Sequence, residues 1–414
     1  MRTKIKLGDC ITSFIDHRGK TPAKMGGDWS EDGIRVISAL NVHNGIIDNI
    51  DKIRCVSFEI YKKWMDEDIK RNDCLIASEG ASLGENAIWD SDEKIVLGQR
   101  LYAIRTNPNV LDPWFFAAYM QTSKFKKQID QISTGSTVFG ISQQVLLDII
   151  LLLPEIDEQR QIGEFYKIML HKLVNNAQKI SVLNSIIDDI YCYWFENYNF
   201  PTCDKKPYKE NGGLFEYNNL IKKDIPLGWS VAPMLDLAYW ETNSQPPKSE
   251  FCYEERDGYV RFIQNRDYDS SDYLTYVPKT KSLSIVNRFD ILMDKYGDAG
   301  MVRYGIEGAF NVALAKIGVK KGNALEYIRC FLASKPIYEY LHNACMASTR
   351  ASLSEDNIKP LYVIVPPDDL LNQFESLVHS LRKTILNYKD ENESINHMKK
   401  EFLPLLMNGQ ASVK

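Results

Sequence analysis

Two long stretches of the chain carry apolar residues at alternating steps of four and three positions. In the first stretch these positions are Ile162, Tyr166, Met169, Leu173, Asn176, Ile180, Leu183, Ile187, Ile190 and Trp194. The second stretch repeats the spacing 212 residues later, at Phe374, Val378, Leu381, Ile385, Tyr388, Asn392, Ile395, Lys399, Phe402 and Leu406. Steps of four and three keep these positions on one face of a helix. The pattern therefore predicts two long helices, with polar interruptions at Asn176, Asn392 and Lys399.

A globular domain is predicted before each helix. Short apolar runs separated by turn residues indicate strands, as in GIRVISALNVHNG (33–45) and DCLIASEGAS (73–82). The second domain follows the first in the same order, with residues 288–292 matching 71–75 and Gly297 matching Gly80. An internal repeat on this scale predicts two copies of one architectural unit.

The fold class that follows is α+β. Two pseudo-repeated mixed α/β globular domains, at 1–153 and 225–365, are separated by two long helices, at 154–197 and 366–414. The segment 198–224 is polar, contains Pro and Gly, and is predicted to be a linker.

The two helices are expected to pack on each other as an antiparallel coiled coil, because their apolar faces continue for more than four heptads. Asn176, Asn392 and Lys399 would then set the register. The alternative is that each helix packs only on its own globular domain. Apolar residues beside the main face could contact helices of a partner; these are Phe165, Leu170, Ile186 and Leu377.

Composition limits the class of protein. The chain has 414 residues, 44% hydrophobic content and 25% charged content, which are typical of globular domains. No apolar run is long enough to span a membrane, and the N-terminus lacks the apolar segment of a signal peptide, so we expect a cytoplasmic protein. The net charge of −5 does not exclude nucleic acid, because phosphate binding needs only a local basic face.

No catalytic or metal site is predicted. The chain has no P-loop and no HExxH spacing, and none of its eight cysteines forms a CxxC pair. The motif DPWF (112–115) is better explained by Pro113 starting a helix than by a methyltransferase site. Two other classes stay open at this point: a coiled-coil scaffold protein and an uncharacterised nuclease.

Several motifs resemble one known family, the specificity subunits of Type I restriction-modification systems (HsdS). The most specific are LLLPEIDEQRQIGEFY (151–166) at the start of the first long helix and YCYWF (191–195) at its end. STGSTVFGIS (133–142), IPLGW (225–229) and LPLLMNGQASV (403–413) also resemble segments of that family. The resemblance covers essentially the whole chain.

The resemblance implies a DNA-recognition subunit that is not itself an enzyme. Each globular domain would be a target recognition domain that reads one half of an interrupted sequence in double-stranded DNA. The helices would set the spacer and dock two modification (methyltransferase) subunits, with restriction subunits joining the full complex. S-adenosylmethionine, ATP and Mg²⁺ would be used by those partners, and this chain would bind no cofactor.

Loop residues with amide, hydroxyl or cationic groups are the candidates for DNA contact, because Arg, Asn and Gln can make bidentate bonds to bases. In the first domain these are Arg18, Lys20, Thr21, Lys24, Ser78, Ser82, Asn86, Thr134, Ser136 and Thr137. In the second domain they are Gln245, Asn265, Arg266, Tyr268, Lys295, Tyr296, Arg303, Ser348, Thr349 and Arg350. The alternative at each position is an ordinary solvated turn. Because the loop HRGKTPAK (17–24) has no close counterpart near 245–250, the two domains are expected to read different sequences.

Overall fold

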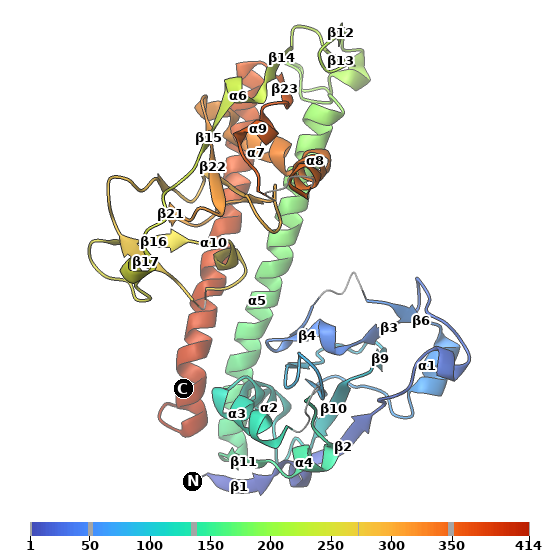
Figure 1. Cartoon of the computed structure of the whole chain (residues 1–414). Coiled ribbons are helices and arrows are strands. Elements are labelled where there is room, and N and C mark those ends of the chain that lie inside the picture. The colour runs from blue at the N-terminus through green and yellow to red at the C-terminus, as the bar shows by residue number, and fades with distance from the viewer. Residues whose placement is uncertain (1, 49–52, 134–138, 272, 347–351, 414) are drawn as a thin grey trace. The chain divides into compact units, whose positions relative to one another are not determined.

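The computed structural model describes residues 2–48, 53–133, 139–271, 273–346 and 352–413, and the chain divides into two compact units. Unit 1 contains residues 1–178 and 388–414, and unit 2 contains residues 179–387. Both division points lie inside long helices, α5 (Ile156–Tyr191) and α10 (Asp368–Asn408). Each unit therefore combines one globular domain with a segment of both helices (Figure 1).

The domain of unit 1 is built on a four-stranded antiparallel sheet with the order β2-β10-β7-β8. A second sheet has the order β6-β3-β9, and its β3–β9 pair is parallel. Strands β1 and β11 form an antiparallel pair, as do β4 and β5. The strands are β1 (Thr3–Lys6), β2 (Ile11–Asp16), β3 (Ile34–Ile37), β4 (Val42–His43), β5 (Ile46–Ile47), β6 (Cys55–Val56), β7 (Cys74–Ala77), β8 (Asn86–Ile88), β9 (Ile95–Leu97), β10 (Leu101–Thr106) and β11 (Ile150–Leu153). The helices are α1 (Phe58–Trp64), α2 (Pro113–Met120), α3 (Ser123–Ile132) and α4 (Gln143–Leu147).

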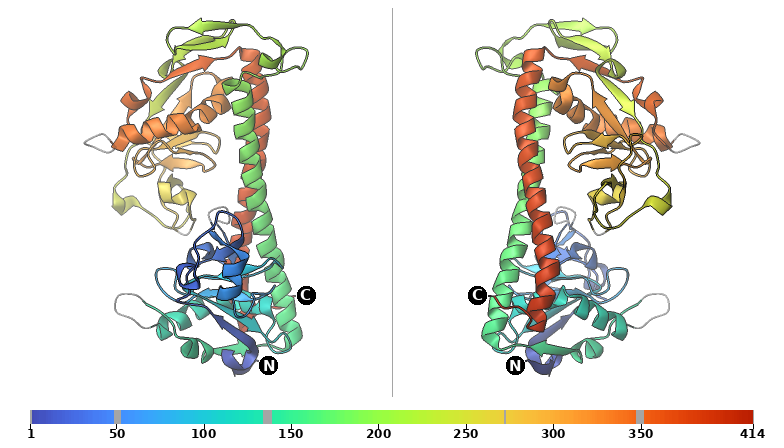
Figure 2. Two further views of the ribbon diagram at one scale, coloured as in Figure 1. Left: turned by 90° about the vertical axis from the view of Figure 1, so that its right-hand side faces the viewer. Right: turned by 90° about the vertical axis from the view of Figure 1, so that its left-hand side faces the viewer.

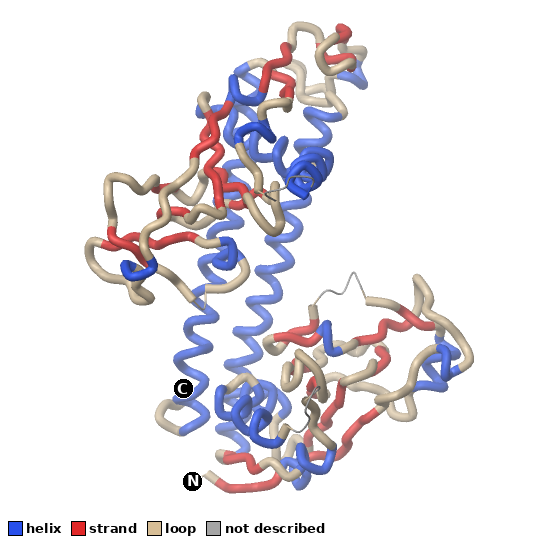
Figure 3. The backbone as a smooth tube through the Cα atoms, in the orientation of Figure 1, coloured by secondary structure: helices blue, strands red, loops and turns tan. Residues whose placement is uncertain are grey.

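Unit 2 repeats the strand order of the main sheet of unit 1, whereas its second sheet has the order β17-β16-β21-β18. Its four-stranded sheet, β15-β22-β19-β20, places the strands in the same sequential order, and its β16–β21 pair is again parallel. The strands are β12 (Phe215–Asn218), β13 (Lys223–Pro226), β14 (Ser230–Pro233), β15 (Ala238–Glu241), β16 (Tyr259–Ile263), β17 (Tyr276–Pro278), β18 (Ile285–Val286), β19 (Ile291–Asp294), β20 (Val302–Arg303), β21 (Gly308–Phe310), β22 (Leu314–Val319) and β23 (Tyr362–Val365). The helices are α6 (Met234–Leu237), α7 (Leu325–Ala333), α8 (Lys335–Met346) and α9 (Glu355–Ile358). Long loops connect these elements in both domains (Figure 3).

The segment predicted to be a linker, 198–224, contains some regular structure. It includes β12 and the first residues of β13, which pair as an antiparallel hairpin within unit 2. Phe200 is buried and stacks on Tyr208, with ring centroids 4.6 Å apart. Two aromatic side chains are enough to anchor the segment in the domain. Its mostly polar composition therefore did not reveal this packing.

Within each unit the α5 segment and the α10 segment lie side by side and run in opposite directions (Figure 2). In unit 1, the buried Asn176 donates to Asn392 Oδ1 at 2.9 Å and to Glu391 Oε2 at 2.8 Å. In unit 2, Phe374 packs on Trp194, with ring centroids 5.8 Å apart. Two of the polar positions expected to set a register therefore contact each other.

The buried face of α10 departs from the predicted spacing near its end. Phe402 is 44% exposed, whereas Leu403 is 3% exposed and belongs to the core of unit 1. A straight α-helix drifts by about 20° per heptad from a strict seven-residue repeat, so after several heptads the buried position moves to a neighbouring residue.

The motif at the start of α5 is explained by its contacts with the preceding domain. Gln159 is buried, donates to the carbonyls of Val110 and Pro154, and accepts from the Asp112 amide at 3.1 Å. A Cβ on Gly163 would lie 2.4 Å from Asp112 Oδ1, so only glycine permits this approach of α5 to α2. The Gln and Gly of this motif thus attach the helix to its domain.

Candidate nucleic-acid interface

The basic loop 17–24 of unit 1 uses most of its cationic groups internally. Arg18 donates from Nε and Nη2 to the Asp16 carboxylate at 3.0 and 2.9 Å and stacks on the Tyr102 ring. Burial acts to raise the pKa of Asp16, but the bonds from Arg18 keep that pKa below its ordinary value. Lys20 Nζ donates to the Trp64 carbonyl at 2.7 Å and contacts the Asp66 carboxylate at 2.6 Å. These bonds hold the loop against α1.

The other two candidates in this loop are more available. Lys24 is exposed, and among the described residues its ammonium donates only to the Gly19 carbonyl, at 2.6 Å. The Thr21 hydroxyl is partly exposed and accepts from the Lys24 amide. Lys24 can therefore still offer donors to a phosphate.

The loop 78–86 places its polar groups in the interior of unit 1. Ser78 is 1% exposed and Asn86 is 4% exposed. The Asn86 amide group donates to the carbonyls of Gly84 and Met120, and its oxygen accepts from Gln121. Both residues leave the set of proposed DNA contacts because their side chains do not reach solvent, whereas Ser82 stays partly exposed.

The matching loop of unit 2 is built around a buried ion pair. Arg303 donates to Asp294 Oδ2 at 3.2 and 2.9 Å, and its side chain is 18% exposed. Burial raises the pKa of Asp294 even though Arg303 acts to lower it. Arg303 therefore mainly compensates a buried carboxylate, while Lys295 is partly exposed and Tyr296 is 45% exposed beside it.

The remaining described candidates lie on two other loops of unit 2. Gln245 and Arg266 are exposed, and Arg266 donates to the Tyr273 carbonyl at 3.3 Å. Asn265 is partly exposed. The Tyr268 ring is partly exposed, but its hydroxyl is buried without a hydrogen-bond partner among the described residues, and burial raises its pKa. The other candidates lie outside the described residues; these are Thr134, Ser136, Thr137, Ser348, Thr349 and Arg350.

One arginine that was not among the candidates has a guanidinium with no acidic partner among the described residues. Arg54 is exposed and stacks on the Trp29 ring, with its Cζ atom 3.7 Å from the ring centroid. The two residues are 25 positions apart in the chain, and no motif in the sequence connects them. Their contact could be found only in the folded domain.

Exposed apolar side chains follow one face of each long helix. In unit 1, Met398, Phe402 and Leu405 of α10 are 38, 44 and 38% exposed at steps of four and three. In unit 2, Val182 and Ile186 of α5 are exposed one turn apart. Of the residues expected to contact a partner, Ile186 and Leu377 are exposed, but Leu170 is buried in the core of unit 1 and is not available. A row of exposed apolar side chains on a helix face is a candidate surface for contact with another protein.

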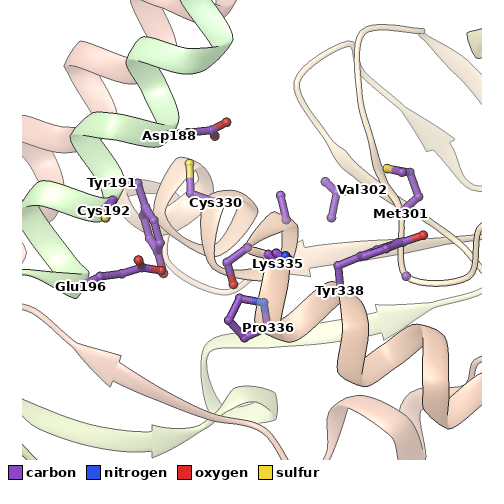
Figure 4. Close-up of a pocket in the computed structure, with 13 residues that line it drawn as sticks. Asp188, Tyr191, Cys192, Glu196, Met301, Val302, Cys330, Lys335, Pro336 and Tyr338 are labelled. Atoms are coloured by element: carbon purple, nitrogen blue, oxygen red, sulfur yellow. The ribbon is translucent and has the colours of Figure 1, made fainter. Parts of the chain in front are cut away.

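A pocket of about 540 Å³ lies beside the end of α5 in unit 2, where the helix closes with a π-helical turn at Cys192–Glu196 (Figure 4). Its polar lining includes the carboxylates of Asp188 and Glu196 and the ammonium of Lys335. Lys335 also contacts Glu339, at 3.8 Å. Because carboxylates outnumber cations here, the pocket is unsuited to a DNA phosphate and is not part of the interface.

Three potential metal ligands gather in unit 2. Ligand atoms of Glu326, Glu375 and His379 lie within 4.8 Å of one another. Glu326 already accepts from Arg329 at 2.9 Å and from Arg382 at 2.6 Å. Two guanidinium groups beside the same carboxylate supply its counter-charge, which makes the cluster a poor host for a metal cation.

Within the described part of the chain, no helix combines the length and apolar character that a bilayer crossing requires.

Comparison with known proteins points to one family. A family model described as a Type I restriction modification DNA specificity domain matches residues 3–185. The chain is 24% identical over 307 residues to the Type I restriction enzyme MjaIX specificity subunit of Methanocaldococcus jannaschii, which covers 71% of this chain and 68% of the relative. It is also 24% identical over 391 residues to the putative MjaX specificity subunit of the same organism, covering 89% of this chain and 87% of the relative.

The fold also has a counterpart among solved structures. The crystal structure of a Type I restriction-modification S subunit from M. genitalium superimposes with a TM-score of 0.61. The match covers 98% of this chain and 96% of that chain, at 14% identity. At this identity the likeness shows that the fold is shared.

Proposed function

We propose that this chain is a specificity subunit of a Type I restriction-modification system and that each of its domains reads one half of an interrupted DNA sequence. A specificity subunit is the DNA-recognition part of such a complex and is not its catalytic part. We propose that partner subunits use S-adenosylmethionine, ATP and Mg²⁺ and that this chain binds none of them. We also propose that the complex acts in the cytoplasm.

The observation that carries this proposal is the use of one strand arrangement in both units with different polar groups on the loops. The sheets β2-β10-β7-β8 and β15-β22-β19-β20 have the same order. The loop after β7 contains the buried Ser78, whereas the loop after β19 contains the exposed Tyr296. Two domains with the same scaffold and different loops are suited to recognise two different half-sites, because the loops provide the specificity and the scaffold holds them in place.

We propose that the long helices set the spacer. The 36 residues of α5 correspond to about 54 Å of helix at 1.5 Å per residue. This exceeds one turn of DNA, about 34–36 Å, so the spacing is compatible with two major-groove contacts more than one turn apart.

The test uses the full chain assembled with its modification subunits and a library of random DNA duplexes at constant salt. Sequencing of the bound duplexes should give two short specified segments separated by an unspecified gap. Binding without any enriched sequence would contradict the proposal and would favour a scaffold. The purified chain alone is expected neither to cleave nor to methylate DNA, and cleavage would favour a nuclease.

We further propose that two modification subunits dock on the exposed apolar faces of the helices. Replacing Phe402 and Leu405 by Glu should weaken assembly with the modification subunits, because it places charge on an apolar contact surface. Leu40→Glu is the matched control, since Leu40 is 74% exposed on the globular domain of unit 1 and is not a residue of either long helix. Size-exclusion chromatography with light scattering reports the assembly. An equal loss of assembly in the helix variant and in Leu40→Glu would contradict docking at this face.

A further inference from the structure

The guanidinium of Arg54 differs from those of the other arginines of unit 1. Seven of them have a carboxylate oxygen within 4.0 Å; these are Arg2, Arg18, Arg35, Arg71, Arg100, Arg105 and Arg160. Arg54 has no carboxylate partner among residues 2–48, 53–133, 139–178 and 388–413, and its side chain makes no hydrogen bond to them. Its hydrogen-bond donors are therefore unused within the described domain.

The backbone holds Arg54 and Trp29 next to each other. The residues that follow them, Cys55 and Ser30, are joined by two backbone hydrogen bonds, from Ser30 N to Cys55 O at 2.9 Å and from Cys55 N to Ser30 O at 3.3 Å. Asp28 also accepts from the Trp29 amide, at 2.8 Å. The ring on which the guanidinium stacks is thus attached to the small sheet that contains β6.

The Arg54 Cζ atom lies over the Trp29 ring, 3.7 Å from its centroid, while the N–H groups of the guanidinium have no hydrogen-bond acceptor among the described residues of the domain. An arginine has five donors in a rigid fork, and two of them match O6 and N7 of guanine in the major groove. Holding the fork on an aromatic ring reduces the conformational freedom that must be lost when the two bonds form. A lysine in the same place could contact a phosphate but could not make this bidentate contact.

The surroundings also favour contact with DNA over a role in folding. Lys24 lies on the loop that precedes Trp29 in the chain, and Lys62 and Lys63 lie on α1, which follows Arg54 and β6 in the chain. None of the three has a carboxylate within 4.0 Å among the described residues. Lys63 donates to the Met25 carbonyl at 3.4 Å, which joins α1 to the loop that leads to Trp29. Cations of this kind position the DNA backbone, while a stacked arginine is suited to a base edge.

We propose that Arg54, oriented by Trp29, reads a guanine in the half-site recognised by unit 1. This inference rests on the proposed function, because it assigns one base contact to one of the two half-sites. Arg54 would be a specificity-determining residue and Trp29 its positioning residue.

The experiment compares four variants of the full chain, each assembled with the modification subunits, by sequencing the duplexes bound from a random library. Arg54→Ala should remove the preference for guanine at one position of one half-site, lowering selectivity there by about 5- to 150-fold, while the other half-site is unchanged. Arg54→Lys should lose the same preference but keep the salt dependence of overall affinity. Trp29→Ala should lower the same preference by about 2- to 30-fold, since the free guanidinium is no longer oriented.

Arg35→Ala is the matched control. Arg35 lies on β3 opposite Cys55, its side chain is 45% exposed, and its guanidinium already bonds Glu93 at 3.1 Å. Arg35→Ala should therefore leave the recognised DNA sequence unchanged. Thermal melting of each variant shows whether the domain is folded; Arg54 and Trp29 are both on the surface, so the melting temperature should hold.

The outcomes separate the two proposals. If the wild-type complex selects a sequence and Arg54→Ala selects the same one, the role of Arg54 is refuted and the proposed function stands. A uniform loss of affinity for all sequences in Arg54→Ala, with a smaller salt slope, would make Arg54 a phosphate contact and would also refute base reading. No selection by the wild-type complex would refute the proposed function itself.

Discussion

A buried carboxylate in unit 2 should hold α10 against the globular domain of that unit. Glu326 of α7 is 0% exposed and accepts hydrogen bonds from Arg329 (1% exposed) and from Arg382 of α10 (6% exposed). Glu326→Gln would leave two buried guanidiniums with no carboxylate bonded to them. Breaking a buried charge pair from one side costs about 3–5 kcal/mol, which is a large fraction of the roughly 5–15 kcal/mol that stabilises a typical domain.

Urea unfolding followed by circular dichroism, with hydrogen exchange in α7 as a local probe, measures this loss. The matched control is Glu339→Gln, because Glu339 pairs with Lys335 on the surface at 3.8 Å and should contribute less than about 1 kcal/mol. Adding Arg382→Met to Glu326→Gln should recover part of the loss, since one unpaired charge is then removed. A change below about 1 kcal/mol for Glu326→Gln would refute the reasoning.

The same network predicts a dependence on pH. Burial acts to raise the pKa of Glu326, but the charges of Arg329 and Arg382 keep that pKa below its ordinary value of 4.5. A carboxylate with a lowered pKa stabilises the fold above its unfolded pKa and loses that contribution as the pH falls through the folded pKa. The wild type should therefore lose stability below about pH 4.5 faster than Glu326→Gln does.

Three further variants test the contacts of the long helices in unit 1. Gly163→Ala should destabilise unit 1 by about 1–3 kcal/mol in urea unfolding, because its Cβ would overlap Asp112; an unchanged midpoint would show that α5 can shift. Asn176→Ala should cost about 1–3 kcal/mol by removing two hydrogen bonds, including the one to Asn392, and full stability would argue against their role. Burial lowers the pKa of Lys399 from 10.5 to about 8, so the unfolded chain binds more protons between these values and wild-type stability should rise across that pH range. Lys399→Met should abolish this rise, and a rise of the same size in the variant would exclude Lys399 as its source.

Periodicity predicted the long helices well because it depends only on local geometry. Alternating steps of four and three placed Asn176 and Asn392 on helix faces that contact each other in unit 1. Near the end of α10 the prediction was wrong by one residue, since Leu403 is buried in place of Phe402. The heptad repeat can be read from the spacing of apolar residues. The small drift of a straight helix relative to that repeat shifts the buried position only over the whole length of the helix.

Charge partners could not be predicted in the same way. The sequence shows that Arg18, Arg303 and Arg54 carry hydrogen-bond donors, but it does not show which donors are already used. Arg18 pairs with a residue two positions away and Arg303 with one nine positions away, and each of these pairs occupies the guanidinium. Likewise, Asn86 looked like a base-reading amide until its bonds to the carbonyls of Gly84 and Met120 were seen.

The sequence by itself determined the two long helices, the strands of the globular domain before each helix and the motifs that resemble one known family, because each of these depends on residue types at short and regular spacings. Only the tertiary structure decided which polar groups are bonded within the domains and which stay exposed for a contact with DNA. Hydrogen bonds and ion pairs are satisfied by whichever groups folding brings within about 3 Å, however distant they are in the chain. The stacking of Arg54 on Trp29 is such a case, since it depends on two hydrogen bonds between backbone segments 25 residues apart.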